Sequence, residues 1–285
     1  MSELVNKMTY NNGILLISLG YISIERIKIM ACVLSIVNQK GGVGKTTTAI
    51  NLSAYLALKG KKVLLVDLDP QGNATSGYGF NKAELDSSVY DILVNEAEIS
   101  EVIQSTNRKN IEMCPTNINL AGAEVELVSA MSRETILKRA LEPVMQKYDF
   151  ILIDCPPSLG LLTINALAAS TGVLVPIQGE YYALEGLTQL IDTINLVKRH
   201  LNPSIGIFGV VLTMYDQRTQ LTRQVTEEVN KYFGDKVFNT VIPRNIRLAE
   251  APSYGKTIAE YDPKSKGGKA YAELAAEVIK RTKGK

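Results

Sequence analysis

The chain has 285 residues, of which 31 are Lys or Arg, 29 are Asp or Glu and one is His, so its net charge is only +2. Its hydrophobic residues make up 46% of the total, enough to bury one sizeable core, and we expect one main domain rather than two small ones. Three cysteines, Cys32, Cys114 and Cys155, lie far apart. Their spacing argues against a disulfide framework and a cysteine zinc site, and it indicates a reducing, cytoplasmic setting.

The charge is unevenly distributed along the chain. Residues 1–197 hold 15 Lys/Arg and 20 Asp/Glu, a net charge of −5, whereas residues 198–285 hold 16 and 9, a net charge of +7. A basic C-terminal part is what a polyanion-binding face needs, although solvated helix faces would give the same count. The charge alone leaves both interpretations open.

Residues 1–29 do not follow the pattern of the rest of the chain. They contain an apolar run at 14–19, which Gly20 interrupts and residues 21–24 resume, and this run is too short to span a bilayer. Because Met30 directly precedes the first predicted core strand, we expect a disordered extension or a start site assigned too early. A peripheral membrane anchor is the alternative. The main domain is expected to span residues 30–285.

From residue 33 onward, short apolar segments alternate with stretches of helical length. The segments are rich in Val, Ile and Leu, as strands buried on both faces of a parallel sheet are. The predicted strands span residues 33–38, 62–67, 111–114, 149–154, 172–177, 205–213 and 237–242. Predicted helices span residues 46–58, 134–147, 183–200, 219–233 and 270–281. The alternation predicts an α/β fold with a mostly parallel sheet, helices on both faces and right-handed crossovers.

A glycine-rich loop joins the first predicted strand to the first predicted helix. Its sequence is Lys40-Gly41-Gly42-Val43-Gly44-Lys45-Thr46-Thr47. Glycines let the backbone curl so that successive N–H groups and the helix N-terminus face phosphate oxygens. Lys45 adds a positive charge, and Thr46 adds a hydroxyl that can bind magnesium. Strand, loop and helix occur in the required order, which predicts a site for ATP and Mg²⁺.

Two carboxylates complete the predicted site. Asp69 follows the strand at 62–67, and Asp154 ends the strand at 149–154. Because α/β sheets bind ligands at the carboxyl ends of their strands, we expect both to lie near the loop. Asp154 resembles a Walker B aspartate, which holds magnesium, and Asp69 resembles a switch aspartate, which orients the attacking water. Each alone could be a turn at a strand end, but together with the loop they predict a nucleotide hydrolase.

The loop departs from the ordinary P-loop pattern at its start, where Gln39 stands in place of glycine and Lys40 follows. This form resembles the deviant P-loop ATPases, a family of nucleotide-dependent dimers with a single P-loop NTPase domain. The resemblance implies that Lys40 reaches across a homodimer to the phosphates bound by the other subunit. Lys45, Lys40 and Asp69 are then the predicted catalytic residues, and Thr46 and Asp154 are the predicted metal-binding residues.

Three further segments narrow the resemblance to the chromosomal ParA/Soj partition ATPases. They read IQGEYYALEG at 177–186, LTMYDQR at 212–218 and VIPRNIRLAEAP at 241–252, and the similarity continues from about Met30 to near the end. It implies that Pro243 and Asn245 border the adenine, and that Glu180 reaches the ribose bound by the other subunit. It also implies that Arg218 and Arg247 belong to a surface that binds DNA without sequence preference, although each could be an ordinary ion-pairing arginine.

The resemblance implies a cycle in which ATP closes a homodimer, the dimer binds DNA, and a ParB-type partner speeds hydrolysis. We therefore expect a cytoplasmic, nucleoid-associated protein that drives chromosome or plasmid segregation, without integral membrane insertion. The alternative is a MinD-like membrane-positioning ATPase, which needs a separate amphipathic tail, whereas residues 270–281 are predicted to pack on the domain.

Three other classes fit the sequence less well. A guanine-nucleotide switch needs an Asn-Lys-x-Asp base reader, and residues 81–84, Asn-Lys-Ala-Glu, end in the wrong acid. An iron–sulfur protein of this family needs suitably spaced cysteines. A sequence-specific regulator needs an N-terminal helix-turn-helix domain, for which 29 residues are too few.

Overall fold

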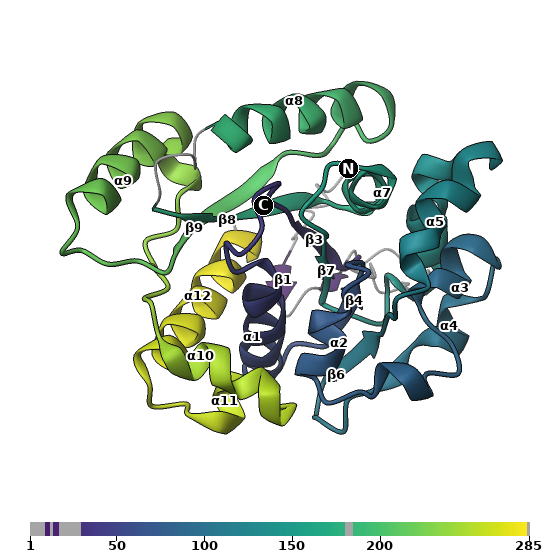
Figure 1. Cartoon of the computed structure of the whole chain (residues 1–285), viewed down its shortest axis with the longest axis horizontal. Coiled ribbons are helices and arrows are strands. Elements are labelled where there is room, and N and C mark those ends of the chain that lie inside the picture. Colours follow the sequence, from purple (N-terminus) through teal and green to yellow (C-terminus); the bar gives the residue numbers. More distant parts are fainter. Residues whose placement is uncertain (1–8, 12–13, 17–29, 180–184, 284–285) are drawn as a thin grey trace, which may run out of the picture.

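The computed structural model describes residues 9–11, 14–16, 30–179 and 185–283. A seven-stranded sheet in the order β5-β6-β4-β7-β3-β8-β9 forms its centre (Figure 1). Its strands are β3 (Cys32–Ile36), β4 (Val63–Asp67), β5 (Gln104–Ser105), β6 (Ile111–Cys114), β7 (Phe150–Asp154), β8 (Gly172–Gln178) and β9 (Ile207–Thr213). Every neighbouring pair is parallel except β5 and β6, which are antiparallel. The prediction of a mostly parallel sheet is confirmed.

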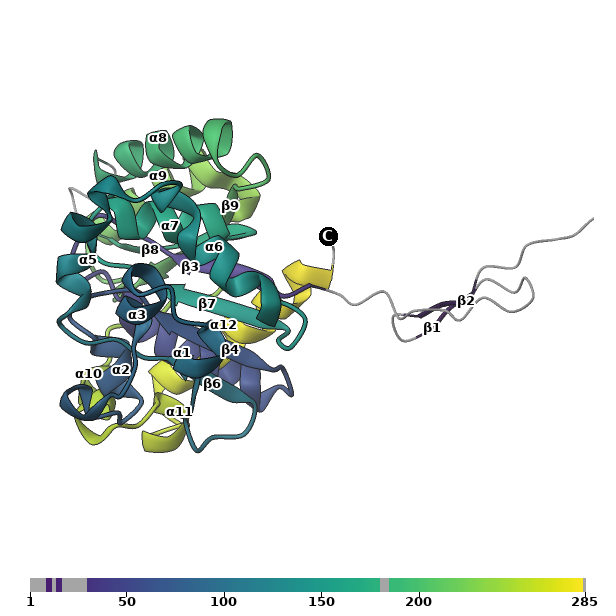
Figure 2. The ribbon, with the colours of Figure 1, turned by 90° about the vertical axis from the view of Figure 1, so that its right-hand side faces the viewer.

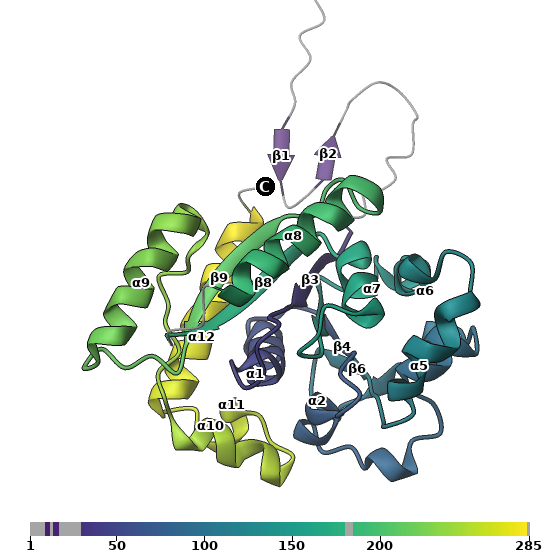
Figure 3. The same cartoon turned by 45° about the horizontal axis from the view of Figure 1, so that its top comes forward.

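Helices cover both faces of the sheet. The longer ones are α1 (Lys45–Leu58), α7 (Leu161–Ala169), α8 (Glu185–His200), α9 (Gln220–Phe233) and α12 (Lys266–Lys283). The shorter ones are α2 (Asn73–Gly77), α3 (Val89–Val94), α4 (Ile99–Val102), α5 (Leu120–Glu126), α6 (Ile136–Leu141), α10 (Ile246–Glu250) and α11 (Ile258–Tyr261). Figures 1 and 3 place α9, α10 and α12 toward the β9 edge, and α3 and α5 toward the β6 edge.

Alternation along the central strand divides the core in two. In β3, Leu34 and Ile36 pack into a cluster with α1 and α12, whereas Val33 belongs to a cluster with α3, α7 and α8. Successive side chains of a strand point to opposite faces, so a strand covered by helices on both sides must be apolar throughout. β4 and β7 are buried at every position for the same reason. Their carboxyl ends, where the polar residues begin, meet at one edge of this core.

The prediction of a strand at residues 237–242 is wrong. This segment runs beside β9, where the amides of Phe238 and Ile242 donate to the carbonyls of Val210 and Leu212 at 2.8 Å. Between these two bonds, the amides of Asn239 and Thr240 donate to the carboxylate of Glu277 on α12 instead of to a strand. The carboxylate therefore draws the chain away from the sheet, and only isolated bridges remain.

The predicted helix at 134–147 is also wrong, because it is divided into three pieces. A 3-10 helix, η3 (Arg133–Thr135), precedes α6, and a second 3-10 helix, η4 (Glu142–Val144), follows it. Pro143 lies in η4, where it has no N–H to donate and its ring crowds the preceding turn. A continuous α-helix could not pass this position without a kink.

The first 29 residues contribute one described feature. Strands β1 (Thr9–Asn11) and β2 (Ile14–Leu16) form an antiparallel pair that is separate from the main sheet (Figure 2). Our expectation for residues 1–29 stays a prediction. Among the residues that the structure describes, no helix is long and apolar enough to cross a membrane.

Candidate nucleotide-binding site

The glycine-rich loop begins directly after β3, at a turn that Asn38 shapes. The Asn38 side chain donates to the carbonyl of Pro176 at 2.8 Å and accepts from the amide of Lys40 at 2.9 Å. Gly42 and Gly44 then adopt φ angles of 74° and 85°. These angles lie in the left-handed region, which glycine adopts without the steric cost that a side chain brings. The glycine pattern is therefore required by the backbone path.

The loop is also tied to the neighbouring strand end. The Thr213 hydroxyl, at the end of β9, donates to the carbonyl of Val43 at 2.8 Å. Helix α1 starts at Lys45 with no side-chain cap and no acid in its first turn. Its N-terminal N–H groups and the positive end of its dipole consequently face the open space beyond the loop, as an anion site requires.

A cavity of about 290 Å³ lies above this loop. Methyl groups added at Gly41 or Gly42 would meet nothing within 4 Å, so the space over the loop is open. The lining residues are Gly41, Gly42, Gly44, Lys45, Thr46, Thr47, Asp69, Gln71, Asn73 and Pro157. The cavity thus brings together the predicted phosphate loop and one of the predicted carboxylates.

Lys45 is buried at the base of the loop. Its ammonium group donates to the carbonyl of Lys40 at 3.1 Å, which holds the charge inside the curve of the backbone. Burial lowers the pKa of Lys45, and the nearby acidic groups of Asp154 and Asp69 act in the opposite direction. The side chain therefore sits between the loop and the acidic ends of the strands.

Asp154 and Asp67 end adjacent strands and stand opposite each other in the β4–β7 register. Both are fully buried. Burial raises the pKa of Asp67 to about 6, although hydrogen bonds from the Thr75 hydroxyl and amide act against this change. Burial, with the nearby charge of Asp67, raises the pKa of Asp154 well above its usual range. Sequence reasoning missed Asp67, whose role is to fix the turn leading to α2.

The residues present fit a magnesium ion. Both carboxylate oxygens of Asp154 are buried without completing a hydrogen bond within the described part of the chain. The Thr46 hydroxyl lies close enough to lower the pKa of Asp154. A buried acid with unused lone pairs is costly unless a cation or donor satisfies it. Because Mg²⁺ binds few protein oxygens and completes its shell with phosphates and water, one carboxylate and one hydroxyl suffice.

Asp69 lies at the rim of the same cavity. Its Oδ1 accepts from the amide of Gln71 at 3.0 Å, so the side chain is held by its own turn. The residue is only 7% exposed and lines the cavity together with Lys45 and Thr46. This position is compatible with the water-orienting role predicted from the sequence, and the role itself stays a prediction.

A second cavity of about 410 Å³ adjoins the first, and Gly42, Gly44 and Thr47 line both. Its other lining residues are Thr213, Met214, Ile242, Pro243, Arg244, Asn245, Ile246, Leu248, Ala249 and Tyr271. Pro243 and Asn245, predicted to border the base, both lie here. Sequence reasoning missed Thr213 and Met214. The one unusual feature of Met214 is its φ of +48°, in the left-handed region, and such a backbone angle cannot be predicted from the sequence.

The two predicted DNA-binding arginines line neither cavity. Arg218 is 89% exposed and forms two hydrogen bonds with the carboxylate of Asp216, which lower the pKa of that acid to about 2. Arg247 is half exposed and pairs with Glu250 at 2.9 Å. Both arginines are thus surface ion-pairing residues, which leaves their predicted contact with DNA open. Glu180 lies outside the described residues.

A parallel sheet, a glycine loop entering a helix, and two joined cavities above that loop define a P-loop nucleotide-binding protein. Residues 31–207 match the family model described as an AAA domain. The chain is 61% identical over 249 residues to the sporulation initiation inhibitor protein Soj of Bacillus subtilis, covering 87% of this chain and 98% of that protein. It is 54% identical to the chromosome-partitioning ATPase Soj of Treponema pallidum, covering 88% and 98%.

A solved structure is also similar to this chain over most of its length. The cobyrinic acid a,c-diamide synthase from Mycobacterium smegmatis, with bound ADP and magnesium, is 39% identical with a TM-score of 0.78, over 89% of this chain and 96% of that one. The chain belongs to the Soj/ParA family of chromosome-partitioning ATPases. The resemblance predicted from the sequence is confirmed.

Proposed function

We propose that this chain is an ATP-dependent dimeric switch that binds DNA without sequence preference and drives chromosome or plasmid segregation. Its cofactors are ATP and Mg²⁺, and its reaction is the hydrolysis of ATP to ADP and phosphate. The observation that carries the assignment is the pair of joined cavities, one floored by the phosphate loop and the other bordered by Pro243 and Asn245. Together they accommodate a nucleotide whose base and phosphates lie on either side of Thr47.

In this proposal, the residues of the loop act mainly by positioning and charge. The amides of Gly41 to Thr47 and the Lys45 ammonium bind the phosphate oxygens, and Asp69 orients a water toward the γ-phosphorus. Thr46 and Asp154 would hold Mg²⁺, which would supply positive charge beside the bound phosphates. Since these groups are fixed by buried strands and turns, little reorganisation is needed when the nucleotide binds.

The dimer and its partners are the finer part of the proposal. Lys40 supplies its charge to the nucleotide of the other subunit, and Glu180 contacts the ribose there. Arg218 and Arg247 bind DNA phosphates in a cytoplasmic, nucleoid-associated dimer. A ParB-type partner then accelerates an otherwise slow hydrolysis, after which the dimer separates and leaves the DNA. The basic C-terminal part of the chain supports the DNA-binding step.

One experiment tests this function. DNA binding of the purified protein is measured by fluorescence anisotropy with ATP, with ADP and without nucleotide, on two unrelated duplexes. We expect ATP to tighten binding to both duplexes by at least roughly tenfold. Lys45→Ala, which removes the buried charge at the loop, is the control and should lose the ATP effect. Equal affinity in all three nucleotide states would contradict the proposed switch.

The packing of α12 argues against a MinD-like membrane function. Its distinguishing element would be an amphipathic tail detached from the domain. The apolar face of α12 is instead buried against α1, with Tyr271, Leu274 and Val278 at most 1% exposed. The Tyr271 hydroxyl lies 3.1 Å from that of Thr48 on α1. This helix is therefore part of the core.

A further inference from the structure

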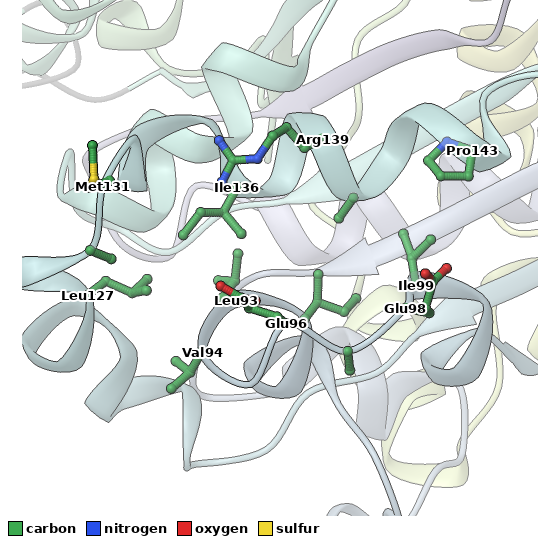
Figure 4. A pocket seen from close by; sticks show the side chains of 14 residues that line it. Leu93, Val94, Glu96, Glu98, Ile99, Leu127, Met131, Ile136, Arg139 and Pro143 are labelled. Atoms are coloured by element: carbon green, nitrogen blue, oxygen red, sulfur yellow. The ribbon is translucent and has the colours of Figure 1, made fainter.

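A groove of about 540 Å³ lies away from the nucleotide site, between α3 and α4 on one side and α6 on the other (Figure 4). Figure 4 shows Met131 and Leu127 at one end and Pro143 at the other. We name it the α3–α6 groove. Its lining residues are Ile92, Leu93, Val94, Glu96, Ala97, Glu98, Ile99, Leu127, Ala130, Met131, Ile136, Arg139, Ala140 and Pro143.

The floor of the α3–α6 groove is apolar, and apolar side chains continue beyond one end. Leu93 and Leu127 are buried at the bottom, and Ile136 is partly exposed on the wall. Met131 is 91% exposed, and Val128, three residues before it, is 63% exposed. Exposing such apolar side chains to water is unfavourable, and a group of them beside a groove commonly marks an interaction surface.

The charge around the α3–α6 groove is negative. Residues 89–103, which form the wall with α3 and α4, hold four acids and no Lys or Arg, and residues 81–142 hold 11 acids and six bases. Glu96 and Glu98 line the groove, where Arg139 is the single cation among the lining residues. Neither glutamate forms an ion pair within the described part of the chain.

These charges decide between possible occupants. Nucleic acid and anionic lipid headgroups would be repelled by the acidic wall, whereas Lys and Arg side chains would be attracted. The exposed apolar side chains of Met131 and Val128, at one end of the groove, suit the apolar face of an amphipathic helix. We propose that the α3–α6 groove docks a basic amphipathic helix of a partner protein. Its apolar face lies against Met131 and Ile136, and its cations lie beside Glu96 and Glu98.

The walls of the α3–α6 groove also contact the segment that leads from the phosphate cavity. On α7, Asn165 accepts from the amide of Leu137 at 3.2 Å and donates to the carbonyl of Arg133 at 2.8 Å. The Thr163 hydroxyl donates to the carbonyl of Ser158, next to cavity-lining Pro157. A docked helix would therefore contact α6, which is hydrogen-bonded to α7, the helix that follows the segment beside the phosphate cavity. This consequence rests on the proposed function, whereas the docking itself does not.

The test uses the full chain and a synthetic probe. The probe is a fluorescein-labelled 18-residue peptide with leucines at helical spacing and lysines elsewhere, and binding is followed by anisotropy without nucleotide. Glu96→Lys combined with Glu98→Lys should weaken binding by at least roughly tenfold, because attraction becomes repulsion at two places. The matched control, Glu84→Lys with Asp86→Lys, changes the net charge equally at exposed acids outside the groove, and should change binding less than about twofold.

A second probe carries glutamates in place of lysines. It should bind the Glu96→Lys, Glu98→Lys protein more tightly than the unmodified one. Equal weakening by both charge-reversal pairs would show general attraction and overturn the docking site, as would the absence of binding to the unmodified protein at about 1 mM peptide. Thermal unfolding verifies that each variant folds. The same variants should retain ATP-dependent DNA binding. Measuring it distinguishes a failure of the docking proposal from a failure of the proposed switch.

Discussion

Burying the Asp154 carboxylate costs free energy that a bound cation would offset. Its carboxylate is buried beside Asp67 without completing a hydrogen bond among the described residues. Asp154→Asn keeps the shape while removing the charge, so we expect the nucleotide-free protein to become more stable by about 1–3 kcal/mol. Urea unfolding at 25 °C measures this gain. Magnesium should no longer add to the stabilisation by ATP, because its carboxylate ligand is lost.

The same strand offers a control at its opposite end. Asp149 is exposed, pairs with Lys61 at 3.5 Å and accepts from the amide of Lys62. Asp149→Asn should therefore leave stability unchanged or lower it by less than about 1 kcal/mol. A loss of stability in Asp154→Asn comparable to other buried substitutions would show that the carboxylate is satisfied in the free protein.

Asp69 should separate nucleotide binding from hydrolysis. Asp69→Ala removes the predicted water-orienting group at the cavity rim and leaves the phosphate loop intact. We expect ATP affinity within about threefold of the unmodified protein and hydrolysis slower by at least roughly tenfold. The variant should then accumulate as a dimer on DNA. Size-exclusion chromatography with ATP provides the check, and a monomeric but folded variant would argue against the role.

We expect the Lys40 side chain to be needed for dimerisation but not for ATP binding by the monomer. Its carbonyl holds Lys45, and that contact does not depend on the Lys40 side chain. Lys40→Ala should therefore bind ATP at nearly the affinity of the unmodified protein and fail to dimerise. Analytical ultracentrifugation with ATP and magnesium measures both forms. Dimerisation of this variant at the unmodified level would make Lys40 an ordinary loop residue.

Helix α12 belongs to the core at the scale of whole elements. Leu274 is fully buried between α12 and α1, so Leu274→Ala should lower the free energy of unfolding by about 2–5 kcal/mol. Its neighbour Glu273 is exposed, and Glu273→Ala should change stability by less than about 0.5 kcal/mol. Denaturant unfolding compares the two. Equal, small effects would mean that α12 is detached, as a membrane-binding tail would be.

Elements were predictable where local pattern and tertiary context agree. The buried strands of the sheet, the glycine loop and α1 depend on apolar runs and backbone requirements that are written in adjacent residues. The segment at 237–242 looked like a strand because its apolar residues also pack on the sheet, but Glu277, distant in sequence, takes its hydrogen bonds. The break at Pro143, by contrast, could have been predicted from the sequence, because proline interrupts a helix, but we predicted an unbroken helix at 134–147.

The site was predictable to the extent that its residues form motifs. All the predicted loop residues except Lys40 and Val43 line one cavity together with Asp69, and Asp154 lies beside Thr46, as their positions at strand ends indicated. Met214 and Thr213 were not predicted as cavity residues because their contribution depends on where β9 ends relative to the loop. Roles that need a second subunit or DNA, such as those of Lys40 and Arg218, depend on surfaces that one chain does not define.

The two surface arginines give a test at the scale of the whole molecule. Arg218→Ala and Arg247→Ala should each weaken DNA binding similarly for unrelated sequences and flatten the plot of log affinity against log salt by roughly 0.9 per lost contact. ATP binding should survive, since neither side chain lines a cavity. A salt series of anisotropy titrations measures the slope. Unchanged slopes would move the DNA surface to the Lys264, Lys266 and Lys269 cluster.

Two oppositely charged segments lie toward opposite edges of the sheet: residues 89–103, with four acids and no Lys or Arg, lie toward the β6 edge, and residues 207–247, with six Lys/Arg and four acids, lie at the β9 edge (Figure 1). Such a separation contributes an electric dipole directed from the β6 edge toward the β9 edge. In the field of a polyanion, that dipole experiences a torque that turns the β9 edge inward before any contact forms. The β6 edge then points to bulk solvent, so a cationic protein can approach it while the opposite edge is still engaged, and added salt should weaken this alignment.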